Sequence, residues 1–152
     1  MDYRSTASFG KREEYVAVTE LLRRGFDIYM TLIDDQQIDY IIRQEQKSKL
    51  RYLDVQIKAR SNNVKHAGTF AVLTVRNPRS NYLFIFFSEV INTYWIIPSI
   101  DLVKLDNINK GGKSKKGKNK DKFIIILANK NKTGWKPRPK FSQYENNFSS
   151  MC

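Results

Sequence analysis

Residues 52–60 read YLDVQIKAR, and the alternation in this stretch decides the fold class. Every second residue from Leu53 onward is apolar, whereas the positions between them carry charged or amide side chains. A period of two residues is typical of a β-strand that buries one face and keeps the other polar. Gln56 and Lys58 are two positions apart, so both point to the polar face. The stretch therefore predicts a strand with a core on one side and room for a site on the other.

A helix is predicted before this strand, over residues 10–24. Glu14 begins a helical face whose apolar members are Ala17, Val18, Leu21 and Leu22. Gly25 follows two arginines, as a helix-terminating glycine often does. An ionised carboxylate on an apolar face costs free energy unless it is paired or binds a cation. We therefore expect a functional carboxylate at Glu14 rather than at Glu13, which lies about 100° round the helix.

Short stretches rich in aromatic and β-branched residues occupy much of the remaining sequence, as in strands. They cover residues 26–32, 38–43, 69–75, 82–87, 93–97 and 123–128, and a short helix is expected at 100–105. One helix followed by about six strands predicts an α/β (α+β) fold built on one sheet. The aromatic residues from Tyr82 to Trp95 are expected in the core.

Positive charge is concentrated in the last third of the 152-residue chain, whose length suits one domain. Residues 1–109 carry 15 basic and 13 acidic side chains, and residues 110–152 carry 12 basic and 2 acidic ones, so the net charges are +2 and +10. Composition predicts a lysine-rich loop at 109–122 and a basic C-terminal extension at 129–152. A nearly neutral body with a basic end indicates a polyanionic partner, and nucleic acid is the first candidate.

Several classes of protein and site are disfavoured by the residues that the sequence lacks. No apolar run approaches the roughly 20 residues of a membrane-spanning helix, and the first residues do not resemble a signal peptide, so we expect a cytoplasmic protein. Cys152 is the only cysteine and His66 the only histidine, which argues against an internal disulfide or a zinc site rich in these residues. The glycine spacing of a phosphate-binding loop is absent.

Four residues among the first 60 form a candidate active site. Strand pairing that brings Asp39 beside Gln56 and Lys58, under a helix that presents Glu14, would create a cation pocket next to an ammonium group. A hard divalent cation takes oxygen ligands, activates a water molecule and stabilises charge on a phosphate in transition. A lysine beside it can orient that water or stabilise the transition state. These are the groups that phosphodiester hydrolysis needs.

The same part of the sequence resembles the PD-(D/E)xK nuclease superfamily. The resemblance covers roughly residues 8–100, in order and in spacing. The matching residues are Gly10, Glu14, Ala17, Leu21, Gly25, Phe26, Ile38, Asp39 and the VQIK run at 55–58. Within the superfamily, the chain resembles the homing endonucleases encoded in group I introns of bacterial tRNA genes. It resembles archaeal-type Holliday junction resolvases more distantly.

The resemblance implies a restriction-endonuclease-like core, with a central mixed sheet flanked by helices, in one nuclease domain spanning 1–152. It implies Asp39 as the central metal ligand, Glu14 as a second ligand and Lys58 as the catalytic lysine. Mg²⁺ is the expected metal, and Mn²⁺ is expected to substitute. Gln56, a further expected ligand, stands where the family usually has an acid, which leaves the number of metals open. Asp54, on the same strand face, is the alternative ligand.

The activity implied is that of a site-specific homing endonuclease that makes double-strand breaks in double-stranded DNA of the bacterial nucleoid. Two cuts need two active sites, so we expect at least a symmetric dimer, and the resemblance suggests a tetramer. A junction resolvase or a restriction-type nuclease would share the same site. A DNA-binding protein without catalytic activity is the alternative of another class.

Two groups of DNA contacts are expected. Lysines on a glycine-rich loop can reach phosphates but are poorly fixed for reading base edges. Arg76 and Arg79 lie beside the Asn77-Pro78 turn, and we expect them to read bases from a β-ribbon. The other expected DNA-binding residues are Lys113, Lys115, Lys116, Lys118, Lys136 and Arg138.

Overall fold

The computed structural model describes residues 3–33, 36–62, 64–105 and 121–152. Most of the lysine-rich loop expected at 109–122 lies outside these ranges, and so do four expected DNA contacts. These four are Lys113, Lys115, Lys116 and Lys118. Within the described ranges, no helix is long and apolar enough to span a membrane.

The first element, α1, spans Tyr3–Arg23 and is longer than expected at its start. It ends as the sequence predicts, because Gly25 adopts a φ of +83° and the Phe26 N–H turns back to a carbonyl of the last helical turn. From residue 10 onward, its buried positions are Glu13, Ala17 and Leu21. Leu22 is 54% exposed, so the expected apolar face is wrong by part of a turn.

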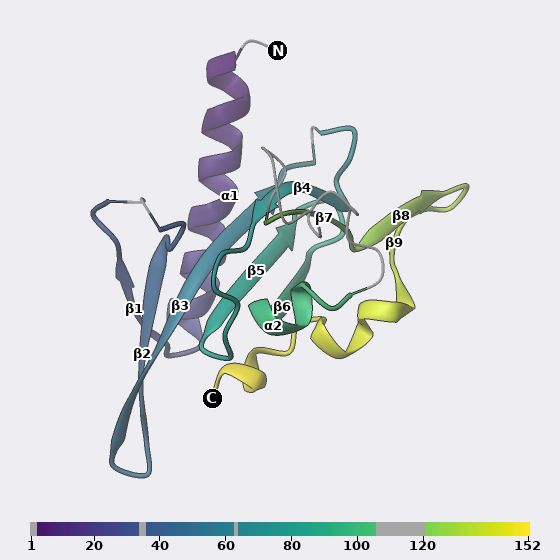
Figure 1. Ribbon diagram of the computed structural model, residues 1–152. Helices are drawn as coiled ribbons and strands as arrows, with labels where there is room; N and C mark the ends of the chain where they lie inside the picture. Colours follow the sequence, from purple (N-terminus) through teal and green to yellow (C-terminus); the bar gives the residue numbers. More distant parts are fainter. Residues whose placement is uncertain (1–2, 34–35, 63, 106–120) are drawn as a thin grey trace.

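Five strands form the central sheet in the order β1-β2-β3-β5-β6 (Figure 1). They are β1 Asp27–Met30, β2 Tyr40–Gln46, β3 Lys49–Arg60, β5 Tyr82–Ser88 and β6 Thr93–Pro98. β3 and β5 run parallel and the other neighbours run antiparallel, so the expected mixed sheet is confirmed.

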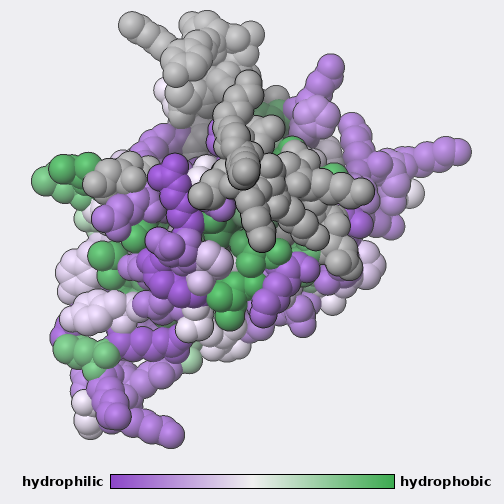
Figure 2. All heavy atoms as spheres, in the orientation of Figure 1, coloured by the Kyte–Doolittle hydropathy of each residue, from purple (hydrophilic) through white to green (hydrophobic). Residues whose placement is uncertain are grey.

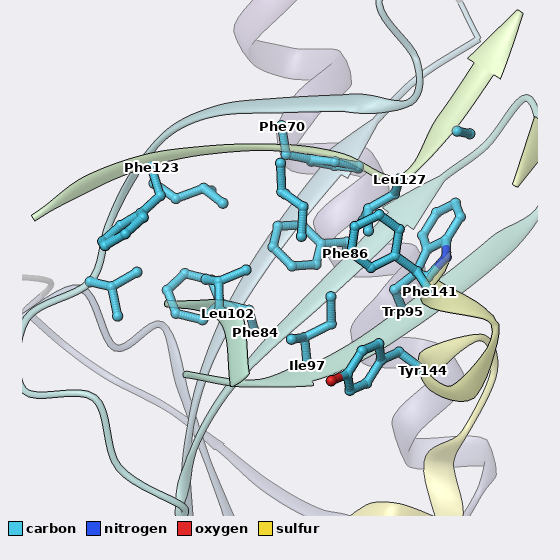
Figure 3. Packing of buried hydrophobic residues seen from close by; sticks show 14 of the residues in the cluster. Phe70, Phe84, Phe86, Trp95, Ile97, Leu102, Phe123, Leu127, Phe141 and Tyr144 are labelled. Carbon is cyan, nitrogen blue, oxygen red and sulfur yellow. The ribbon is translucent and has the colours of Figure 1, made fainter. Parts of the chain in front are cut away.

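The two faces of this sheet bury different kinds of side chain. α1 covers an aliphatic face that includes Leu53, Val55, Ile57 and Ile85. The other face is aromatic and is covered by β4 Thr69–Thr74, β7 Lys122–Ile126, the short helix α2 Ser99–Leu102 and the 3-10 helix η2 Pro139–Tyr144. Figure 3 shows the rings of Phe84, Phe86, Trp95 and Phe70 gathered in this second cluster. The long helix α1 therefore flanks the sheet on one face, whereas the paired strands β4 and β7, with the short helices α2 and η2, cover the other.

The last 25 residues are part of the folded body rather than a simple basic extension. β8 Ala128–Asn131 and β9 Gly134–Pro137 form a hairpin, and the chain ends in the 3-10 helix η3 Phe148–Met151. Phe141 and Tyr144 belong to the aromatic cluster, and Phe148 and Met151 to the aliphatic one. Composition concealed this, because a few large apolar residues anchor a segment that is otherwise polar.

Candidate active site

Pairing between β2 and β3 ends beside Asp39, the residue just before β2. Tyr40 opens β2 opposite Val55. The Asp39 N–H donates to the Val55 carbonyl at 3.0 Å, and Asp39 Oδ2 accepts the Ile57 N–H at 3.0 Å. The carboxylate thus accepts the hydrogen bond that a backbone carbonyl of the partner strand would otherwise accept from β3. A hydrogen bond to a charged acceptor is strong. Asp39 is thereby fixed at the edge of β3, beside the peptide group of Gln56.

Gln56 faces away from α1 and is only 4% exposed. The Tyr82 hydroxyl lies 3.3 Å from Gln56 Oε1 and 3.0 Å from the Gln37 carbonyl oxygen. A tyrosine hydroxyl has one hydrogen to donate, so these two acceptors share it. One phenol therefore connects β3, β5 and the segment that leads to Asp39.

Lys58 lies on the same face as Gln56 and in register with Phe86 of β5. It is partly buried, and it makes no hydrogen bond or ion pair with the residues that the structure describes. A primary ammonium carries three donors, and burial without partners costs free energy. The Lys58 ammonium is therefore available to a bound anion or to water.

The charged residues at the two ends of this strand face are already engaged. Arg79 Nη2 pairs with Asp54 Oδ2. Arg60 Nε donates to the Thr69 carbonyl at 3.3 Å, its guanidinium stands 5.2 Å from the centre of the Phe70 ring, and burial lowers its pKa. Asp54, the alternative ligand, thus has a cationic partner of its own, which leaves the middle of the face to Gln56 and Lys58.

Glu14 approaches the same sheet edge from the side of α1. It is 20% exposed and pairs with Lys11 Nζ at 2.5 Å. Burial raises the pKa of Tyr40, and the negative charges of Glu14 and Asp39 raise it further. The Tyr40 hydroxyl is buried and has no hydrogen-bond partner among the described residues. A protonated phenol therefore lies within the electrostatic reach of both predicted carboxylate ligands.

Glu13 is more buried than Glu14, at 2% exposed, contrary to the expected helical face. It pairs with Arg12 at 2.7 Å. Burial raises the pKa of Tyr94 to about 12, and the charge of Glu13 contributes to that rise. Tyr94 lies on β6, at the opposite edge of the sheet from β1. The charge of Glu13 thus raises the pKa of Tyr94, whereas the charges of Glu14 and Asp39 raise the pKa of Tyr40.

Three of the four predicted site residues lie on or beside β3, and the fourth, Glu14, lies on α1. Asp39 lies at the edge itself, Gln56 and Lys58 lie on the aromatic face, and Glu14 lies on the side of α1. Beyond Val55, β2 no longer pairs with β3, so the edge is not covered by a neighbouring ladder there. A ligand at Asp39 could therefore meet side chains from both faces of the sheet.

The donor set suits a hard cation that is completed by water and substrate. Asp39 and Glu14 offer carboxylate oxygens and Gln56 an amide oxygen, the ligand class of Mg²⁺. The described residues contain no group of three or more His, Cys, Asp or Glu side chains placed to hold a metal. Mg²⁺ does not need such a cage, because it usually keeps waters and binds through one or two carboxylates plus phosphate.

Arg76 and Arg79 do not lie on a β-ribbon, contrary to our expectation. β4 pairs with β7, and β5 pairs with β3 and β6, so their segment connects two different sheets. The Arg79 guanidinium donates to the Asn77 carbonyl at 3.0 Å, pairs with Asp54 and stands over the Tyr82 ring at 4.9 Å. The Arg79 guanidinium is thus engaged in contacts within the protein, whereas Arg76 is exposed.

Lys136 and Arg138, also expected to bind DNA, occupy different positions on the hairpin of β8 and β9. Lys136 is exposed on β9. Arg138 closes the base of the hairpin, where its N–H donates to the Leu127 carbonyl at 2.8 Å and its Nη1 to the Ile126 carbonyl at 3.2 Å. Lys136 is open to a ligand, and Arg138 mainly anchors the hairpin.

Tyr40 and Tyr82 are two buried tyrosines beside the candidate site whose hydroxyl groups sequence analysis did not consider. Each buries its ring in one of the two core clusters and carries its hydroxyl to the edge of β3 near Asp39 or to Gln56. A signal was present, because a buried tyrosine needs a partner for its hydroxyl. Tyr40 also follows Asp39 directly in the sequence.

The sequence matches no family model and no curated protein. The fold is similar to that of a solved bacterial homing endonuclease, I-Ssp6803I, with a TM-score of 0.61, 16% identity, and coverage of 97% of this chain and 93% of that chain. A nuclease from a fusselovirus aligns with a TM-score of 0.45 and 15% identity over 90% of this chain and 86% of that chain. The first similarity extends over nearly the whole chain, so this chain and the homing endonuclease share an overall fold.

Proposed function

We propose that the chain is a Mg²⁺-dependent DNA endonuclease that makes site-specific double-strand breaks, as a homing endonuclease does. One observation carries the proposal: the Ile57 N–H fixes the Asp39 carboxylate beside Gln56, with the available ammonium of Lys58 on the same strand. The shared fold with a protein described as a bacterial homing endonuclease supports this choice over a DNA-binding protein without catalytic activity.

Each residue has a defined task in this proposal. Asp39 would hold Mg²⁺ with help from Gln56 and Glu14, and Mn²⁺ would substitute. When bound, the cation would activate a water molecule and neutralise charge on the scissile phosphate. Lys58 donates a hydrogen bond to a phosphate oxygen or to the attacking water. The water oxygen forms a bond to phosphorus, the bond from phosphorus to the leaving oxygen breaks, and the leaving oxygen takes up a proton.

A double-strand break also requires two such sites on one DNA. We infer a symmetric assembly of at least two chains, and a tetramer in which two subunits bind one duplex fits the same requirement. Sedimentation of the protein alone measures the number of chains in the assembly, and sedimentation on a short duplex measures the number of chains bound to one DNA. A single chain on each cleaved duplex would contradict the inferred assembly and leave the assignment of the active site intact.

The decisive experiment uses a large library of duplex DNA, because the target sequence is unknown. The purified chain is incubated with the library and Mg²⁺, either without or with excess EDTA. The Asp39→Asn variant is incubated with the library and Mg²⁺ in the same way, and the ends of all products are sequenced. We expect one family of recurrent ends on both strands with the wild-type chain and Mg²⁺ only.

Other outcomes separate the alternatives. Recurrent ends on four-way junctions but not on linear duplexes would indicate a resolvase. Ends that persist with Asp39→Asn would show that the cleavage comes from elsewhere. Selective DNA binding without cleavage products in the presence of any metal would indicate a DNA-binding protein without nuclease activity.

A further inference from the structure

The hairpin of β8 and β9 forms a two-stranded sheet of its own that stands away from the body (Figure 1). Its base is held firmly. Arg138 N–H donates to the Leu127 carbonyl, and Leu127 N–H donates to the Gly68 carbonyl, both at 2.8 Å. A Cβ on Gly68 would come within 2.3 Å of the Ala128 carbonyl oxygen, so the backbones at the base are in close contact. The base of the hairpin is therefore anchored to the body, and we call residues 128–137 the arm.

The arm carries positive charge without any compensating acid. Residues 128–137 contain three Lys and no Asp or Glu. Lys130, Lys132 and Lys136 are exposed, and none of them forms an ion pair with another described residue. Hydrophilic side chains cover the segment that projects to the right in Figure 2, where Figure 1 labels β8 and β9. Such a surface attracts a polyanion.

The tip of the arm is conformationally defined rather than loose. Asn131 Oδ1 accepts hydrogen bonds from the Thr133 N–H at 2.9 Å and from the Thr133 hydroxyl at 2.8 Å. Gly134 adopts a φ of +113°, which a residue with a side chain rarely does. Lys132 is thus presented on a two-residue turn whose backbone is already ordered, so little backbone entropy is lost if it contacts a ligand.

The two faces of the arm differ. Asn129 pairs with Lys136 across the ribbon, and Lys130 pairs with Trp135. Because successive residues of a strand point to opposite sides, Asn129 and Lys136 share one face and Lys130 and Trp135 the other. Trp135 packs against the aromatic cluster, so its face is turned partly toward the body. The face of Asn129 and Lys136 carries an amide and an ammonium group and remains exposed.

We propose that this arm enters the major groove of duplex DNA, with Asn129 and Lys136 toward the base edges and Lys132, at the tip, on a phosphate. The proposal rests on the proposed DNA-cleaving function and names the element that reads sequence. A two-stranded ribbon, with strands about 4.8 Å apart, fits a groove about 12 Å wide. Asn can hydrogen-bond to adenine and Lys to guanine in that groove.

The arm lies well apart from β1 and β2 in Figure 1. The bases that it reads are therefore distant from the phosphate that would be cleaved at the candidate site beside Asp39. This extends the recognition site beyond the cleavage position. Arg79, expected from the sequence as a base reader, is held by Asp54 and Tyr82 instead, so the arm takes over the role assigned to that residue.

The first test measures phosphate contact on a random-sequence DNA duplex by fluorescence anisotropy over a range of salt concentrations. Each phosphate contact contributes about −0.9 to the slope of log K against log salt. We expect Lys132→Ala to reduce the slope by about 0.9. The matched control removes the exposed Lys49. An equal reduction in the control would show a general charge effect and would overturn the role of the arm.

The second test measures base reading by selection from a randomised duplex library. Asn129→Ala and Lys136→Ala should each lose preference at a few positions outside the cleavage site, by about 5- to 150-fold for each base contact. Hydroxyl-radical footprints should lose protection at the same outer positions. An unchanged preference and footprint would overturn the proposal.

A duplex RNA of matched sequence separates groove reading from attraction between charges. Its major groove is too deep and narrow for side chains to read, so the variants at Asn129 and Lys136 should bind it as the wild type does. Equal losses on RNA and DNA would make the arm a simple polyanion contact. The binding tests do not need cleavage, so a chain that binds selectively without cutting refutes the nuclease function while the arm stands.

Discussion

β3 and β5 are parallel neighbours at the centre of the same sheet, yet they bury different chemistry. Every residue of β5 is buried, and six of its seven residues are aromatic or aliphatic. β3 is apolar only toward α1, and on its other face it places Gln56 opposite Phe84 and Lys58 opposite Phe86. The paired residues Phe84 and Phe86 offer no polar group to Gln56 and Lys58, although Gln56 accepts a hydrogen bond from Tyr82 farther along β5.

The difference indicates which strand is shaped by folding alone. A parallel strand covered on both faces usually reads as a continuous apolar run, as β5 does. A buried amide and a partly buried ammonium cost free energy relative to apolar residues of similar size. β3 therefore carries polar groups that the sheet does not need. This identifies the part of the sheet where activity, rather than stability, is expected to respond to substitution.

The largest expected effect is on cleavage. Lys58→Ala and Asp39→Asn should each lower the cleavage rate by about 10²- to 10⁴-fold, the range typical of a group that acts in the transition state, while DNA binding is largely kept. Single-turnover cleavage and anisotropy binding measure the two. Lys49→Ala, at an exposed position of the same strand, is the control. A loss of only a few-fold would remove both residues from the active site.

The matching change on β5 should affect stability instead. Phe86 packs against Phe70 with ring centroids 4.8 Å apart and against Phe84 at 5.9 Å. Phe86→Ala should lower the free energy of unfolding by about 3–5 kcal/mol, because it leaves a cavity in the aromatic cluster. Urea unfolding measures this. A loss below about 1 kcal/mol, or one no larger than that of Lys58→Ala, would erase the contrast between the strands.

A third substitution tests whether Gln56 is close to the metal. Gln56→Glu adds a carboxylate beside Asp39 and should shift the order of preference among Mg²⁺, Mn²⁺ and Ca²⁺, because ligand charge and number govern selectivity for hard cations. We do not expect a more active enzyme. Cleavage is titrated with each metal for both proteins, and Asp54→Glu provides the control on the same strand face. Superimposable titrations of wild type and Gln56→Glu would place Gln56 outside the coordination sphere.

The smallest effect on stability is expected at Tyr40. Its buried hydroxyl has no partner among the described residues, so Tyr40→Phe should leave the free energy of unfolding within about 1 kcal/mol of the wild type, or raise it. Tyr144→Phe is the control, since the Tyr144 hydroxyl bonds to Asp101 at 3.2 Å. A clear loss of stability in Tyr40→Phe would assign the hydroxyl a structural role.

Local pattern predicted most of the central sheet. Alternation placed β3 within a few residues, and runs of aromatic and β-branched side chains located β4 to β7, because these signals need only neighbours in the chain. The hairpin of β8 and β9 was missed, since its four-residue strands are polar and their pairing depends on the turn at Asn131–Gly134.

The candidate site was predicted less completely than the fold. Asp39, Gln56 and Lys58 could be placed together because two lie on one alternating strand, and the third precedes the strand that pairs with it. The rotation of α1 about its own axis is set by packing against the sheet. Sequence alone therefore predicted the wrong one of Glu13 and Glu14 to be the more buried. The pairing of Arg79 with Asp54 joins residues 25 positions apart, and no local pattern reveals such a contact.

The closed base of the β8–β9 arm bears on how the protein could be engineered. Leu127 and Arg138 are joined by a backbone hydrogen bond, and the ribbon beyond them has no ladder partner in the main sheet. Residues can therefore be added to both strands in matched pairs, which preserves the facing of every side chain below the insertion. The arm is a cassette that can be lengthened or exchanged while Asp39, Gln56 and Lys58 remain in place.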